Sequence, residues 1–113
     1  MAILLATHVA QLISGVGIPE FVDRTAIKPE TARLMIRNHN DKALTPCGLG
    51  FSVGTAAGSP GCSEKTFGHT GSIGTLAWAD PLKNTICVVL TSLPVKAVKP
   101  HPRDLAAAQV AAN

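Results

Sequence analysis

Four consecutive residues, His69, Thr70, Gly71 and Ser72, carry the clearest potential for chemistry in this chain of 113 residues. They lie in the stretch FGHTGSIGTLAWADP, residues 67 to 81, which runs into an apolar segment typical of a strand. A histidine between a glycine and a Thr-Gly step is either part of an active site or a tight turn before a strand. Taken by itself, the stretch favours the turn.

The established nucleophile and phosphate motifs are absent around the serines. A Gly-x-Ser-x-Gly elbow would need a glycine two residues before Ser72, where Thr70 stands. No serine is followed by a lysine three positions later, so the sequence contains no Ser-x-x-Lys motif. The segment GSPGCSEKT departs from a phosphate-binding loop, because Ser59 replaces its first glycine and Glu64 replaces the glycine before the lysine.

Neither a pair of catalytic carboxylates nor a metal site is visible from spacing. The seven acidic residues are dispersed along the chain. Cys47, Cys62 and His69 match no zinc-binding pattern and lack an evident fourth ligand. Cys87 lies in an apolar run and is expected to be a buried small hydrophobe. We therefore expect no metal and no other cofactor.

The other three histidines are assigned structural or solvent-exposed positions. His8 falls in an apolar segment with helical spacing, so we expect it to be part of the packing. His39 stands at the end of a predicted helix and is expected to cap it. His101 lies between two prolines and is expected to be exposed.

Composition fits one small domain and excludes several classes of partner. The net charge is +3, and the ten basic residues are scattered without interleaved aromatic residues, so nucleic-acid binding is not expected. No basic segment precedes the first apolar run and no run is long enough to span a membrane, so we expect neither a signal peptide nor a membrane anchor, with the cytoplasm as the default location. The large core candidates are few: Phe21, Phe51, Phe67 and Trp78.

Apolar spacing predicts an α+β fold with antiparallel strands flanked by helices. The predicted helices cover residues 2–14, 29–39 and 103–113, and the predicted strands cover residues 48–54, 72–80 and 85–92. Residues 55–65 and 93–102 are rich in glycine, serine or proline and are expected to be loops. The apolar face of the second helix is assigned to Leu34, Met35 and Ile36.

The last two predicted strands are joined by a short turn, DPLKN. Pro81 suits the second position of a β-turn and Asn84 tolerates a left-handed conformation. Strands joined so closely form an antiparallel hairpin. Residues 86–90 are apolar at every position, so the second strand is expected to be covered on both faces.

Four segments in order resemble the C-terminal part of the serine β-lactamase and penicillin-binding-protein superfamily, and most closely its class C-related esterases and peptidases. IKPETARLMIRNH resembles the helix that precedes the sheet in that family, and CGLGFSV resembles the strand after it. FGHTGSIGTLAWADP resembles the Lys/His-Thr-Gly strand, and TICVVLTS resembles the strand that follows. The resemblance implies a single partial domain over residues 1–113.

The resemblance also implies an acyl-hydrolase mechanism and a role for the four central residues. In the family, a serine of Ser-x-x-Lys attacks an acyl carbonyl, assisted by the lysine and by the tyrosine of Tyr-x-Asn. Carried onto this chain, His69 and Thr70 hold the polar end of a small ester, lactam or peptide. Gly71 allows its close approach, and the backbone N–H of Ser72 binds the oxyanion.

The sequence lacks two of the three family motifs, since it has no Ser-x-x-Lys and no tyrosine. We therefore expect a fragment, a truncated homologue or one piece of an assembly, without catalytic activity on its own. Two alternatives stay open: a non-catalytic binding module that covers the same sheet with a protein partner or a second copy, and an unrelated small α+β domain without a site. Sequence does not identify the substrate.

Overall fold

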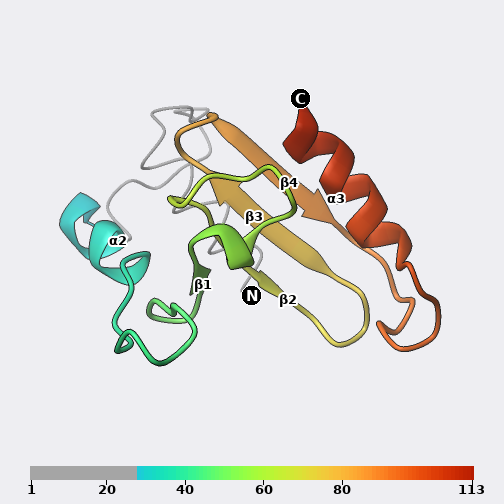
Figure 1. Ribbon diagram of the computed structural model, residues 1–113, viewed down its shortest axis with the longest axis horizontal. Helices are drawn as coiled ribbons and strands as arrows, with labels where there is room; N and C mark the ends of the chain where they lie inside the picture. Colours follow the sequence, from blue (N-terminus) through green and yellow to red (C-terminus); the bar gives the residue numbers. More distant parts are fainter. Residues whose placement is uncertain (1–27) are drawn as a thin grey trace.

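The computed structural model describes residues 28–113, in which four antiparallel strands form one sheet (Figure 1). The strands lie in the order β1-β2-β3-β4, so each pairs with its neighbour in sequence. The predicted helix over residues 2–14, with His8, lies outside the described residues, as does Phe21. The predicted α+β class with an antiparallel sheet is confirmed. The element bounds are α2 Pro29–Met35, β1 Ser52–Val53, the 3-10 helix η1 Thr55–Ala57, β2 Phe67–Thr70, β3 Leu76–Asp80, β4 Thr85–Val89 and α3 Pro102–Ala112.

Helix α2 is shorter than the predicted segment 29–39. It starts with a proline in its first turn and carries Glu30 there, which suits the positive end of the helix dipole. It ends at Met35, with Ile36 as its C-cap, and three residues later the side chain of Asn38 accepts the N–H of Cys47 at 3.0 Å. His39 contacts the carbonyl of Leu34 at 2.7 Å, which confirms its predicted capping position.

The predicted strand over residues 48–54 is reduced to the two residues of β1. The preceding residues turn back on themselves, since the N–H of Gly48 donates to Phe51 and that of Leu49 donates to Met35, each at 2.8 Å. These bonds satisfy backbone groups that a longer strand would have paired with β2.

The predicted strand over residues 72–80 is wrong in its first half, because β3 begins only at Leu76. The residues before it, 71–75, form the loop that joins β3 to β2. His69 and Thr70 are themselves part of a strand, β2, so the interpretation of the whole motif as a turn is wrong for these two residues. Only Gly71 and Ser72 lie in the turn.

The hairpin of β3 and β4 is confirmed, with five paired positions from Leu76 opposite Val89 to Asp80 opposite Thr85. Asn84 in its turn has φ 50°, the left-handed conformation expected from the sequence. The backbone N–H groups of the turn donate to the carboxylate of Asp80, which holds the turn closed.

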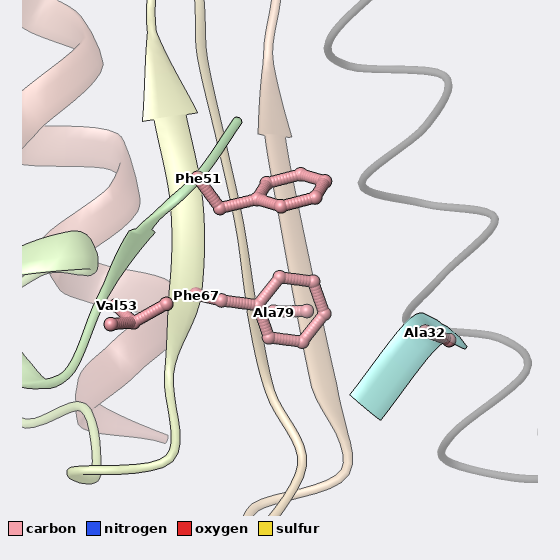
Figure 2. Close-up of a cluster of buried hydrophobic side chains, with 5 residues drawn as sticks. All are labelled: Ala32, Phe51, Val53, Phe67 and Ala79. Carbon is pink, nitrogen blue, oxygen red and sulfur yellow. The ribbon is translucent and has the colours of Figure 1, made fainter. Parts of the chain in front are cut away.

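Two apolar clusters cover opposite faces of the sheet. Figure 2 shows the first, which contains Val53, Phe67 and Ala79 of the sheet, Phe51 just before β1, and Ala32 of α2. The rings of Phe51 and Phe67 meet edge to face with centroids 5.6 Å apart. The second cluster packs α3 on the other face and contains Leu76, Trp78, Cys87, Ala107 and Ala111.

The predicted apolar face of α2 is confirmed for Met35 and Ile36, which are half-buried against the first cluster, but the fully buried helix residues are alanines. Ala32 is fully buried, whereas Leu34 is 42% exposed, so the predicted apolar face of α2 is wrong for Leu34. In α3, Ala107 and Ala111 are buried while Leu105 is 54% exposed. These two alanines pack against Trp78 and Cys87, so α3 contacts the sheet through its smallest side chains.

We expected strand β4 to be covered on both faces. Among residues 28–113, only the face toward α3 is covered. Cys87 is buried against α3, which confirms it as a buried hydrophobe. Burial raises the pKa of its thiol, and the neighbouring Cys62 adds to that effect. Ile86 and Val88 point to the other face and are 37% and 39% exposed. Within the described part of the chain, no helix is both long and apolar enough to cross a membrane.

Candidate functional site

His69 and Thr70 occupy the end of β2 where one edge of the strand is free. On one side they pair with Ala77 and Leu76 of β3. On the other side β1 reaches only Phe67 and Gly68, so the edge beside His69 and Thr70 has no strand partner among residues 28–113. Both side chains are exposed. An open strand edge offers unpaired backbone groups to an extended ligand.

The side chains of His69 and Thr70 lie on opposite faces of the sheet, because successive residues of a strand alternate. His69 is opposite Ala77, which is opposite Val88, so these three form a row on the face away from α3. Thr70 is aligned with Leu76 on the α3 face. One ligand can reach both side chains only if it lies along the free edge.

Gly71 and Ser72 begin a compact loop that closes on itself. The N–H of Gly71 donates to the carbonyl of Thr75 at 2.8 Å, and the N–H of Gly74 donates to the carbonyl of Gly71 at 3.1 Å. A Cβ on Gly71 would collide with the hydroxyl of Thr75, and Gly74 has φ 97°. The loop conformation therefore requires a glycine at position 74, while a side chain at position 71 would displace the hydroxyl of Thr75.

Arg103 at the start of α3 anchors this loop, although it is 32 positions away in sequence. Its Nη1 donates to the carbonyls of Gly71 and Thr75, each at 3.1 Å, and its side chain is 9% exposed. Its Nε donates to Asp104 at 3.2 Å. The N–H of Val95 donates to the carbonyl of Ser72 at 3.2 Å, so the C-terminal segment binds two successive carbonyls of the loop.

Sequence analysis missed Arg103, and one signal in the sequence could have found it. A cation in the first turn of a helix opposes the helix dipole. Such a residue suggests a partner outside the helix, here two backbone carbonyls that accept charge-assisted hydrogen bonds.

The predicted exposure of His101 is wrong, since the residue is 2% exposed. It is the N-cap of α3, and its Nδ1 accepts the N–H of Arg103 at 3.2 Å. Nε2 therefore carries the ring proton and donates it to the carbonyl of Leu93 at 2.9 Å. The prolines on either side fix the backbone, and the imidazole between them ties the preceding loop to the helix that carries Arg103.

The peptide between Gly71 and Ser72 is trans, so its C=O and N–H point in opposite directions. The carbonyl oxygen accepts bonds from Arg103 and Gly74. The N–H of Ser72 donates to no other residue of the described chain, and Ser72 is exposed. The bonds to the carbonyl of Gly71 fix the peptide plane, so the N–H of Ser72 has a fixed direction and can donate to a bound group.

Comparison with protein-family models returns a match to the Beta-lactamase model over residues 4–112. The chain belongs to the beta-lactamase family. A search of curated proteins found no match. The matched range contains the His-Thr-Gly stretch and all the described strands and helices, so the predicted family and the β-lactamase-like α+β fold are confirmed.

This beta-lactamase family chain has a second polar cluster, at the opposite end of β3 from the His-Thr-Gly loop. The carboxylate of Asp80 is 1% exposed and accepts four hydrogen bonds, two of them from the N–H and hydroxyl of Ser63. Burial by itself would raise the pKa of Asp80, but the bonds from Ser63, Lys83 and Leu82 outweigh it and lower that pKa. The cluster is a structural clamp between two loops.

A hollow of about 640 Å³ lies at the start of β2 and contains none of the four predicted site residues. Arg37, Lys65 and Thr66 are among its lining residues, and the hydroxyl of Thr66 is buried without a partner in the described chain. Within residues 28–113, no three histidine, cysteine or acidic side chains gather as a metal site would require. Cys47, Cys62 and His69 are not brought together as one.

Proposed function

We propose that this chain supplies one wall of an acyl-hydrolase site, with the N–H of Ser72 as an oxyanion donor and the free edge of β2 at His69 and Thr70 as the substrate-binding strand. The observation that carries the proposal is the Gly71–Ser72 peptide, whose carbonyl accepts bonds from Arg103 and Gly74 while its N–H has no partner among residues 28–113. A rigid, preorganised donor of this kind stabilises a developing oxyanion by ~2.7–4 kcal/mol in acyl transfer.

In the proposed site, residues outside this sequence supply the nucleophile and its general base. The printed residues contain no Ser-x-x-Lys and no tyrosine, so the chain by itself forms no acyl-enzyme. Without a nucleophile, a site keeps only its contribution from binding and oxyanion stabilisation. The substrate class is a small ester, lactam or peptide that can lie along the edge of β2.

Two measurements on the full chain test the proposal. We expect no turnover of a chromogenic β-lactam or a nitrophenyl ester above that of Gly71→Pro, which removes the N–H that closes the loop. We also expect no covalent adduct with a fluorescent penicillin. Turnover well above that background, or a stable adduct, would contradict the absence of a nucleophile.

The oxyanion role is tested with phenylphosphonate as a tetrahedral anion probe. In a ¹⁵N-labelled sample, we expect its titration to move the amide signal of Ser72 saturably, together with those of His69 and Thr70. Signals that move only at surface lysines would refute the oxyanion donor. In the DNA, an in-frame or neighbouring segment that encodes Ser-x-x-Lys and Tyr-x-Asn would identify the missing half of the site.

A second candidate function, self-association through the sheet, is favoured by the exposed row on β4. Ile86, Val88 and Leu90 alternate along the strand and are 37%, 39% and 73% exposed. A second copy of this chain would bury them. Sedimentation over a concentration series tests this candidate: a dimer that Val88→Lys dissociates supports it, and a monomer at all concentrations refutes it.

A further inference from the structure

The guanidinium of Arg103 lies behind the peptide that carries the proposed oxyanion donor. Its Nη1 reaches the carbonyls of Gly71 and Thr75 at 3.1 Å from a position that is almost fully buried. The carbonyl of Gly71 and the N–H of Ser72 belong to one planar group, so whatever binds the oxygen also orients the hydrogen on the other side.

We propose that Arg103 is a positioning residue for the acyl-hydrolase site, which orients and polarises the Gly71–Ser72 peptide so that the N–H of Ser72 is a stronger and better aligned oxyanion donor. The inference rests on the proposed function of the Ser72 amide. In this proposal Arg103 acts from behind the loop and not on the substrate, since its side chain is 9% exposed and its Nη1 and Nε bind Gly71, Thr75 and Asp104.

Polarisation follows from the charge of the donor. A hydrogen bond from a cation to a carbonyl is roughly twice as strong as one from a neutral group. Hydrogen bonds that share a polarised group strengthen one another by about 10–30%. The guanidinium therefore draws electron density toward the oxygen of Gly71 and leaves the N–H of Ser72 more positive.

Orientation follows from the number of anchors on the loop. The carbonyl of Gly71 also accepts the N–H of Gly74, and the carbonyl of Ser72 accepts the N–H of Val95. These neutral bonds hold the loop, as does the bond from the N–H of Gly71 to the carbonyl of Thr75, and Arg103 adds a charged donor that bridges the carbonyls of Gly71 and Thr75. Removal of Arg103 is expected to leave the loop closed while freeing the Gly71–Ser72 peptide to rotate.

His101 holds the start of α3, and with it Arg103, in position. Its ring accepts the N–H of Arg103 and donates to Leu93, so the start of α3 is tied to the loop that precedes it. Val95, which binds Ser72, lies in that same preceding loop. The C-terminal segment thus forms one unit that fixes the site loop from behind.

The test compares full-length wild-type protein with Arg103→Gln and Arg103→Lys by NMR. Without any ligand, we expect both substitutions to shift the ¹³C signal of the Gly71 carbonyl and the ¹⁵N signal of Ser72, the lysine less than the glutamine. With phenylphosphonate, we expect Arg103→Gln to weaken binding by about tenfold, the equivalent of one net hydrogen bond. The emission of buried Trp78 and the urea midpoint report whether each variant is folded.

Arg33→Gln is the matched control, because Arg33 is exposed on α2 and its loss changes the net charge by the same amount. An equal loss of phenylphosphonate affinity in Arg33→Gln would overturn the positioning role in favour of a general charge effect. A shift of the Arg103 guanidinium signals during the titration would overturn it in favour of direct contact.

The inference and the proposed function fail in different ways. Unchanged Gly71 and Ser72 signals in both variants would overturn the inference, even if phenylphosphonate binds the wild type at Ser72. If phenylphosphonate fails to bind the wild type, the oxyanion function fails together with its positioning residue. If both variants unfold, hydrogen exchange of the arginine side chains in the wild type tests the inference. Slow exchange of the Arg103 guanidinium supports its bonds to Gly71 and Thr75, and exchange as fast as that of Arg33 overturns the positioning role.

Discussion

Replacement of Asp80 by asparagine tests whether the buried carboxylate clamps the two loops at its end of the sheet. Oδ2 accepts the N–H of Ser63 at 2.7 Å, while Oδ1 accepts the hydroxyl of Ser63 and the N–H groups of Leu82 and Lys83. Asparagine has the same shape but carries an NH₂ group in place of one oxygen. If that group takes the place of Oδ2, two donors face each other at Ser63.

The expected cost follows from these contacts. A hydrogen bond to a charged group contributes about 1.5–3 kcal/mol, and the other three bonds weaken when the charge is removed. We therefore expect Asp80→Asn to lower the free energy of unfolding by about 2–4 kcal/mol at pH 7. Exposed Asp41 provides the control, since Asp41→Asn is expected to cost less than about 0.5 kcal/mol.

Urea unfolding monitored by the single tryptophan, Trp78, measures both values, because this residue is 1% exposed in the folded state. The folded state lowers the pKa of Asp80, so the carboxylate stabilises the fold above the unfolded pKa of about 3.9. That stabilisation is lost as the pH falls through the folded pKa. The difference in free energy of unfolding between wild type and Asp80→Asn should therefore shrink as the pH falls from about 5 to about 3. A cost below about 0.5 kcal/mol, or a difference that stays constant down to pH 3, would refute the clamp.

Three further outcomes follow from buried groups elsewhere. Phe67→Ala removes a fully buried ring from the first apolar cluster and should cost about 3–5 kcal/mol in urea unfolding; a loss under about 1 kcal/mol would mean that the cluster is loosely packed. His101→Ala removes the cap of α3 and the bond to Leu93 and should cost about 1–2 kcal/mol at pH 8, and an unchanged urea midpoint would contradict this capping role. Burial raises the pKa of Cys87, so at pH 8 an aromatic disulfide reagent should modify Cys87 more slowly than Cys47. Mass spectrometry of the labelled peptides measures both rates. Faster modification of Cys87 would contradict the prediction.

Much of the sheet follows from local sequence. The turn DPLKN places Asn84 in the left-handed conformation and brings β3 and β4 together, as its residue types predict. The alanine-rich C-terminal segment forms α3 within one residue of the predicted start. The bounds of β1 and α2 could not be predicted, because the bonds of Leu49 to Met35 and of Cys47 to Asn38 depend on how the two segments meet.

The candidate site divides in the same way. Residue types in sequence order identified His69, Thr70, Gly71 and Ser72 as a unit and placed the chain in its family, which the match over residues 4–112 confirms. They also showed that no serine nucleophile of the Ser-x-x-Lys type is encoded in these residues. Their roles in binding stay a prediction.

The sequence by itself determined the hairpin of β3 and β4, its turn and the motif, because these depend on side chains that act over a few neighbouring positions. Tertiary structure alone decided that His69 and Thr70 lie beyond the reach of β1, on an edge without a strand partner in the described part of the chain, and that the carbonyl of Gly71 is bound from α3. It also decided that His101 is buried, against the expectation from its two prolines. Such contacts join a side chain to a backbone carbonyl elsewhere in the chain, 32 positions away for Arg103 and Gly71, and local chemistry does not specify which distant donor binds a buried carbonyl.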